Sequence, residues 1–289
     1  MTHTQPRSLV LQAYGTNRDL DVMEALSLAG AQAEGVPLNE LRTGKKHFTD
    51  YEMLVLPGGF SYADALGAGL LLAIDLKAYF SEEIMSFVES GKPVIGICNG
   101  FQALIKAGVL PGIRAGSDQK RTEKRSARTS ESKGPASNHA GPDESIHKVT
   151  LTFNKCGHFE CRWIFMKPVS EICIWTKGLT GAITCPIAHG EGNFQAAHPD
   201  ILSVLRSSDQ VALTYMNTDG SHAGGEYPAN PNGSILDIAG ICNPQGNVLG
   251  LMPHPENHIH SWQHPRRTRD ETQGSGLVLF ENGVRYSRE

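Results

Sequence analysis

The sequence predicts an α/β fold, in which a doubly wound, mostly parallel sheet carries helices on both faces. Short apolar runs typical of buried strands alternate with segments that place apolar residues at helical spacing. Several of these segments end at glycine or proline, as strands and helices of such folds commonly do. We expect strands at residues 9–14, 33–38, 51–56, 93–97, 148–153, 159–165, 183–188, 211–216, 238–242 and 248–252, and helices at 19–29, 81–89, 101–107 and 276–285.

One predicted helix has a recognisable start. Ser81 is a suitable N-cap residue, and Glu82 and Glu83 follow it in the first turn. Carboxylates there interact favourably with the helix dipole, so we expect this helix to begin at Ser81.

Length and composition indicate one cytoplasmic domain spanning residues 1–289. A chain of 289 residues and 31.3 kDa can bury a large core. A net charge of −4 and a pI of about 6.3 argue against nucleic-acid and membrane-surface partners. The N-terminus is short and polar, and the longest apolar runs are too short to span a bilayer. Six cysteines without a dense framework fit a reducing compartment.

Residues 113–147 differ in composition from the rest of the chain. Lysine and arginine alternate there with serine, threonine, glutamate and glycine, and large apolar residues are scarce. Such a segment cannot bury a core, so we predict a polar, mobile insertion in the domain. A basic arm that binds RNA or a protein partner is the alternative, but the interspersed carboxylates favour a solvated linker.

The centre of the predicted site is the Gly-x-Cys-x-Gly pattern at residues 96–100, between an apolar strand and a helix. This is the nucleophile-elbow pattern with cysteine in place of serine. The sharp turn strains the central residue and is tolerated where the flanking positions lack side chains. Cys98 would then lie at a helix N-terminus, which favours a thiolate. The alternative is that Cys98 is a small buried apolar residue.

A cysteine nucleophile needs a base and a group that orients the base. His254 and Glu256 can fill both roles, because they follow the apolar strand at 248–252 and should emerge at the sheet edge that carries Cys98. Pro255 excludes the helical region for His254, so we expect an extended tripeptide with both side chains on one side. His189 is the rival base, since it also follows a strand-like run.

Two backbone elements are candidates for an oxyanion hole. Gly58 and Gly59 follow the strand at 51–56, where two glycines let backbone N–H groups approach a substrate oxygen closely. The backbone of Asn99, next to the nucleophile, can donate as well. The alternative for the glycines is an ordinary turn at the end of a strand.

We expect no metal site. Cys156, His158 and Cys161 resemble half of a zinc site, but no second pair follows at metal-ligand spacing. The histidines at 254, 258, 260 and 264 are explained more simply by a polar, partly exposed loop, and a metal on His254 would compete with its role as base.

Five segments together resemble a known family. They are Gly-Gly-Phe-Ser-Tyr at 58–62, Gly-Ile-Cys-Asn-Gly-Phe-Gln at 96–102, Ala-His-Gly-Glu-Gly at 188–192, Asn-Pro-Asn-Gly-Ser at 230–234 and Pro-His-Pro-Glu at 253–256. In this order they are similar to the glutaminases of phosphoribosylformylglycinamidine synthase, a family of class I (triad-type) glutamine amidotransferases with a flavodoxin-like fold. The similarity covers most of the chain outside the insertion.

The resemblance implies a reaction. Cys98 would attack the side-chain amide of L-glutamine, form a γ-glutamyl thioester and release ammonia. His254 would transfer the proton, and Glu256 would orient His254. The chain departs from the family pattern at two places: Ala63 stands where many relatives have glycine, and the polar insertion at 113–147 is long.

The resemblance also assigns the surrounding residues. The backbone near Gly58, Gly59 and Asn99 would hold the oxyanion. Gln102 matches a glutamine that contacts the substrate, and His189 and Glu191 match a segment that lines the same pocket.

The resemblance implies partners too. Ammonia would pass to a separate ATP-dependent synthetase that aminates formylglycinamide ribonucleotide, together with a small bridging subunit. We expect no cofactor on this chain and place ATP and magnesium on the synthetase, because Gly44-Lys45-Lys46 is not a P-loop. Two alternatives are a stand-alone cysteine hydrolase of γ-glutamyl substrates and a catalytically dead regulatory module of the same fold.

Overall fold

The computed structural model describes residues 5–112, 148–269 and 275–289, so the predicted insertion at 113–147 lies outside the described residues. Its main feature is a nine-stranded sheet in the order β2-β1-β3-β4-β11-β10-β9-β6-β7, and β5 and β8 form a separate pair. The strands are β1 (Arg7–Gln12), β2 (Gln32–Pro37), β3 (Met53–Leu56), β4 (Val94–Ile97), β5 (Val149–Thr152), β6 (Glu160–Pro168), β7 (Ile183–His189), β8 (Asn193–Ala196), β9 (Val211–Met216), β10 (Ile238–Cys242) and β11 (Val248–Leu251).

The sheet has a parallel part and an antiparallel part. Strands β2, β1, β3, β4 and β11 run parallel to one another, as predicted. From β11 onwards, β10, β9, β6 and β7 are joined by antiparallel pairings. Within the parallel part, β3, β4 and β11 are short and buried along their whole length, which explains why they read as continuous apolar runs, whereas the edge strand β2 is mostly exposed or half-buried.

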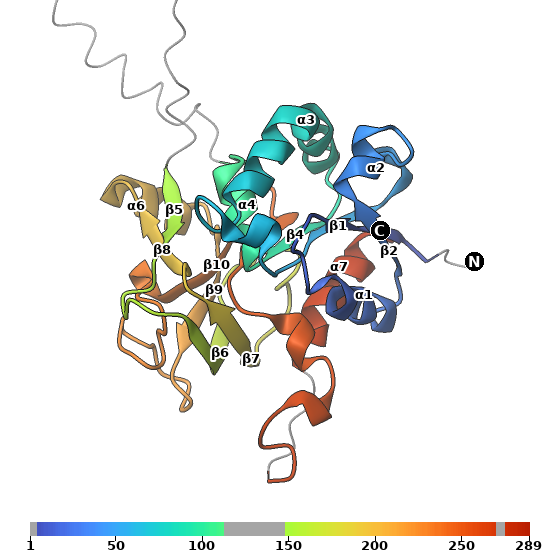
Figure 1. Ribbon diagram of the computed structural model, residues 1–289. Coiled ribbons are helices and arrows are strands. Elements are labelled where there is room, and N and C mark those ends of the chain that lie inside the picture. The colour runs from blue at the N-terminus through green and yellow to red at the C-terminus, as the bar shows by residue number, and fades with distance from the viewer. Residues whose placement is uncertain (1–4, 113–147, 270–274) are drawn as a thin grey trace, which may run out of the picture.

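Helices cover both faces of the parallel part (Figure 1). α3 (Leu70–Glu89) and α4 (Asn99–Lys106) lie on one face, and α1 (Asp19–Leu28) and α7 (Leu277–Tyr286) lie on the other. No helix within the described ranges is long and apolar enough to cross a membrane.

The structure corrects the expected start of one helix. α3 begins at Leu70, so Ser81 lies inside it rather than at its N-cap. Phe80, just before Ser81, has non-helical angles (φ −136°, ψ 16°). The expected N-cap at Ser81 therefore coincides with a kink inside α3. Three short elements had no expected counterpart, namely α2 (Leu38–Arg42), β8 and α6 (Pro199–Ser207).

Candidate active site

The turn from β4 to α4 has the geometry of a nucleophile elbow. Cys98 connects the two elements with φ 49° and ψ −103°, a strained conformation for a residue with a side chain. A Cβ on Gly100 would lie 2.0 Å from the carbonyl oxygen of Leu56, and one on Gly96 would lie 2.8 Å from the carbonyl oxygen of Gly100. Both flanking glycines are therefore required by close packing, and the predicted elbow is present.

The Cys98 thiol lies at the start of α4. Its side chain is 5% exposed, and its sulfur is 3.8 Å from the carbonyl oxygen of Ala188. The first N–H groups of a helix lack partners inside the helix, and the helix dipole favours an anion at this end. A thiolate, the nucleophilic form of cysteine, would meet the positive end of the helix dipole at this position.

His254 and Glu256 form a buried pair after β11. Nδ1 of His254 is 2.6 Å from Oε1 of Glu256, and the two side chains are 4% and 0% exposed. The expected extended tripeptide is wrong, because Pro255 begins a short 3-10 helix that ends at His258. His254 itself stays outside the helical region (φ −106°, ψ 85°), and the turn brings Glu256 back to the ring.

The nucleophile and the histidine converge next to Gly58. A Cβ on Gly58 would lie 2.6 Å from Cε1 of His254 and 3.5 Å from Cβ of Cys98. This convergence follows from the sheet, because β4 and β11 pair in parallel and the N–H of Cys98 donates to the carbonyl oxygen of Leu251 at 2.8 Å. Residues 156 positions apart in the sequence are thus held by neighbouring strands.

The surroundings of His254 favour its protonated form. Burial lowers its pKa, but the Glu256 carboxylate and the Cys98 thiol act against burial and raise the pKa of His254 to about 10. Nε2 of His254 is buried and has no nitrogen or oxygen partner among the described residues. The ring can therefore stand as an imidazolium beside the Cys98 thiolate and give a proton to a leaving group.

A pocket of about 150 Å³ opens beside the Cys98 thiol. A cavity of this size can hold a molecule of about the size of benzene. Five of the predicted residues line it, namely Gly59, Cys98, Gln102, His189 and Glu191. A larger cavity of about 500 Å³ lies between α2 and α3, and none of the predicted site residues lines it.

The predicted oxyanion donors lie around the nucleophile. Gly59 lines the pocket with φ 126°, a conformation that favours glycine. Asn99 is the first residue of α4, so its backbone N–H has no acceptor within the helix. The Asn99 side chain is already engaged, because it donates to Asp64 at 2.8 Å and accepts from Ser61. Only the backbone of Asn99 is therefore available to an oxyanion.

The structure gives His189 a different character from that of His254. Burial first, and then the charge of His254, lowers the pKa of His189 to about 3. His189 is thus too weak a base to deprotonate Cys98 near neutral pH, and the rival-base hypothesis is not supported.

Asn154, which the sequence analysis overlooked, fixes the proton on the His189 ring. Its Nδ2 donates to the carbonyl oxygens of His189 (2.8 Å) and His158 (3.0 Å), and its Oδ1 accepts from the N–H of Gly192 (3.0 Å). These bonds orient the amide, so Nδ1 of His189, 3.1 Å from Oδ1 of Asn154, must be the donor. Nε2 of His189 is then a buried acceptor without a partner among the described residues.

Charged groups line the pocket away from the thiol. Glu191 accepts from the N–H of Ala68 at 3.2 Å and lies 3.9 Å from Nζ of Lys106. Asp64, a second residue that the sequence analysis overlooked, also lines the pocket. Gln102 donates to the backbone oxygen of Glu191 at 2.6 Å, which ties α4 to this wall. Carboxylates in such a pocket suit a cationic group, such as the α-ammonium of an amino acid.

Comparisons with known proteins identify the family of this chain. Residues 5–287 match the family model of the CobB/CobQ-like glutamine amidotransferase domain. A protein of Treponema denticola named phosphoribosylformylglycinamidine synthase subunit PurQ is 50% identical, over 98% of this chain and 99% of its own. A protein of the same name from Dehalococcoides mccartyi is 37% identical, over 98% of each chain.

Solved structures show the same fold. A chain in the structure of PurLQS from Thermotoga maritima matches with a TM-score of 0.68 and 28% identity, over 98% of this chain and 99% of its own. A glutamine amidotransferase from Thermotoga maritima has a TM-score of 0.53 and 14% identity, over 99% of this chain and all of its own, which supports the fold alone. The chain belongs to the CobB/CobQ-like glutamine amidotransferases, in the family of PurQ subunits of phosphoribosylformylglycinamidine synthase.

Proposed function

We propose that this chain hydrolyses L-glutamine and supplies ammonia to a synthetase that converts formylglycinamide ribonucleotide to formylglycinamidine ribonucleotide. The observation that carries the proposal is the convergence of Cys98, His254 and Glu256 beside a small pocket. The names of the relatives supply the nucleotide substrate and the synthetase.

The first half of the reaction forms a thioester. The Cys98 thiolate attacks the side-chain carbonyl carbon of glutamine. The resulting oxyanion accepts hydrogen bonds from backbone N–H groups near Gly59 and Asn99. His254 gives its proton to the leaving nitrogen, the C–N bond breaks, and ammonia departs. Glu256 accepts from Nδ1 of His254 and so orients the ring, and Nε2 carries the transferred proton.

The second half restores the enzyme. His254, now neutral, accepts a proton from water as the water attacks the thioester carbonyl. The carbon–sulfur bond breaks, glutamate leaves, and the thiolate–imidazolium pair forms again. The second proton of the water stays on the new carboxyl group and passes to solvent as glutamate forms, so the imidazole moves one proton in each half of the reaction.

The proposal places the nucleotide chemistry on other chains. L-glutamine would bind here, while ATP and magnesium would bind the synthetase subunit, and a small third subunit would bridge the two. The name PurLQS of the Thermotoga maritima structure supports an assembly of this kind.

The test compares two nitrogen sources in the assembled complex. Cys98→Ala should abolish glutamine-dependent amination and leave ammonia-dependent amination intact. Cys161→Ala, which removes an exposed thiol outside the pocket, is the matched control and should retain both activities. Loss of both activities in Cys98→Ala would show that Cys98 has a structural role, and the function would need to be reconsidered.

Two alternatives make different predictions. A stand-alone γ-glutamyl hydrolase would be fully active without a synthetase, whereas a coupled glutaminase should be weak until its partner binds. A dead regulatory module would form no thioester, so mass spectrometry of the chain quenched during turnover should find no γ-glutamyl adduct on Cys98.

A further inference from the structure

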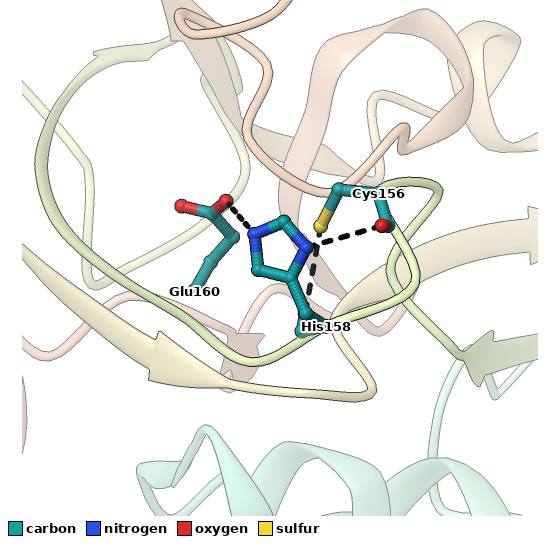
Figure 2. Close-up of side chains that lie close together, drawn as sticks. All are labelled: Cys156, His158 and Glu160. Carbon is teal, nitrogen blue, oxygen red and sulfur yellow. Dashed lines mark hydrogen bonds and ion pairs between the residues drawn. The ribbon is translucent and has the colours of Figure 1, made fainter.

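Three potential metal ligands lie together on the loop that leads into β6, beside the pocket. They are Sγ of Cys156, a ring nitrogen of His158 and a carboxylate oxygen of Glu160, and these atoms all lie within 4.8 Å of one another (Figure 2). The candidate site differs in composition from the half zinc site considered in the sequence, because the third residue near Cys156 and His158 is Glu160 and not Cys161.

The histidine is already oriented as a metal ligand. Its Nδ1 is 3.1 Å from the carbonyl oxygen of Cys156, which can only accept, so Nδ1 donates there. Nε2 shares a proton with Oε1 of Glu160 at 3.0 Å, and a metal ion would take the place of that proton. A metal-bound histidine usually donates its other ring N–H to a carbonyl or carboxylate in this way. Asn154 additionally holds the backbone oxygen of His158 at 3.0 Å, so the loop is anchored on both sides of the ring.

The carboxylate is oriented as well. Nε of Arg162 donates to Oε2 of Glu160 at 2.7 Å, which leaves Oε1 directed at Nε2 of His158, 3.0 Å away. Two bonds of about 2.0–2.1 Å at a tetrahedral angle separate their donor atoms by roughly 3.3 Å, so this pair needs little movement. The Cys156 sulfur must come to within about 3.6 Å of each donor atom. Its side chain is exposed, and this movement exchanges its contact with the backbone oxygen of His158, now at 3.4 Å, for the metal.

We propose that Cys156, His158 and Glu160 form a binding site for a divalent transition metal, best suited to Zn²⁺, with water in the fourth position. Thiolate and imidazole ligands select such metals over Mg²⁺ and Ca²⁺, which prefer oxygen. One thiolate, one carboxylate and one neutral imidazole balance a charge of +2. Phe159 lies between two of the ligands and lines the glutamine pocket, so an occupied site would hold this part of the pocket wall in place.

The test measures Co²⁺ binding in a Cys98→Ala background, which removes the thiolate of the active site. Of the remaining cysteines, only Cys156 and Cys161 are exposed, so a thiolate–cobalt charge-transfer band must come from one of them. We expect one equivalent of Co²⁺ per chain with such a band, displacement by one equivalent of Zn²⁺, and no displacement by excess Mg²⁺.

Single substitutions then identify the ligands. Cys156→Ser should remove the band, and His158→Ala should weaken Co²⁺ binding by at least ~100-fold, in line with the loss of a direct metal ligand. Cys161→Ser is the matched control and should retain both the band and the affinity. Thermal unfolding of each metal-free variant verifies that the chain is folded. Absence of a band in the parent, its persistence in Cys156→Ser, or its loss in Cys161→Ser would each overturn the proposal.

Discussion

The substitution Glu256→Gln tests how much the buried carboxylate contributes to catalysis. Glu256 is fully buried, lies 2.6 Å from Nδ1 of His254, and together with the Cys98 thiol raises the pKa of His254 to about 10. The usual pKa of histidine is about 6.5, and each pH unit corresponds to about 1.4 kcal/mol, so the pair favours the imidazolium by roughly 5 kcal/mol. If Glu256 supplies between half and all of this, its neutralisation should lower kcat by roughly 70- to 5,000-fold.

Two assays measure this loss. Glutamine hydrolysis by the assembled complex gives kcat, and alkylation of Cys98 by iodoacetamide near neutral pH reports the thiolate directly. Both rates should fall, because a glutamine side chain holds no charge opposite the imidazolium. The matched control is Glu24→Gln, which breaks a second His–Glu pair at 2.8 Å to His260 on the surface, and this variant should stay within about twofold of the parent.

The reasoning would be refuted by a folded Glu256→Gln variant that keeps kcat within about tenfold of the parent. Equal loss of ammonia-dependent amination would also refute it, since that reaction bypasses the thiol. The pH dependence offers one more check. His254, with its pKa raised to about 10, should stay an imidazolium at pH 7 in the parent, and its titration, followed by NMR of the ring, should move to lower pH in the variant.

Two further predictions concern the fold around the site. Gly100→Ala should destabilise the chain by about 1–3 kcal/mol and abolish glutaminase activity, because its Cβ would lie 2.0 Å from the Leu56 oxygen; Gly181→Ala, with no atom within 4 Å, should be neutral in urea unfolding. His189 has a pKa of about 3 in the folded chain, so below about pH 6.5 it takes up a proton when the chain unfolds. Its contribution to the free energy of unfolding should therefore fall by up to ~1.4 kcal/mol for each pH unit below about 6.5. Urea unfolding of the parent and His189→Gln measures the stability gap, and a constant gap between about pH 7 and pH 5 would contradict this linkage.

The elbow could be predicted from the sequence because its determinants are local. Gly96 and Gly100 are within two residues of Cys98, and both are needed for close packing that the strand-to-helix turn imposes. His254 and Glu256 could be placed because a buried strand precedes them. The 3-10 turn that begins at Pro255 was missed although its signal is local, because proline is also a common first residue of a helix, and the prediction instead extended the chain through the tripeptide.

Other features were hidden from the sequence for physical reasons. The weak basicity of His189 arises from burial and from the neighbouring charge of His254, and neither has a local signal. Asn154 lies in a loop and Asp64 at the end of a short 3-10 helix, where polar residues are expected without any special role. The start of α3 was missed because no N-cap side chain precedes Leu70; its N-cap is Gly69 in a left-handed conformation.

The pairing of β4 with β11 has a consequence for the evolution of this enzyme. The nucleophile and its proton carrier are aligned by a ladder of main-chain hydrogen bonds, which does not depend on the side chains of the surrounding loops. Loops can therefore be lengthened, shortened or replaced to suit a new synthetase while the sulfur and the imidazole keep their spacing. The same cysteine–histidine pair can therefore serve different synthetases without a change in the strands that position it.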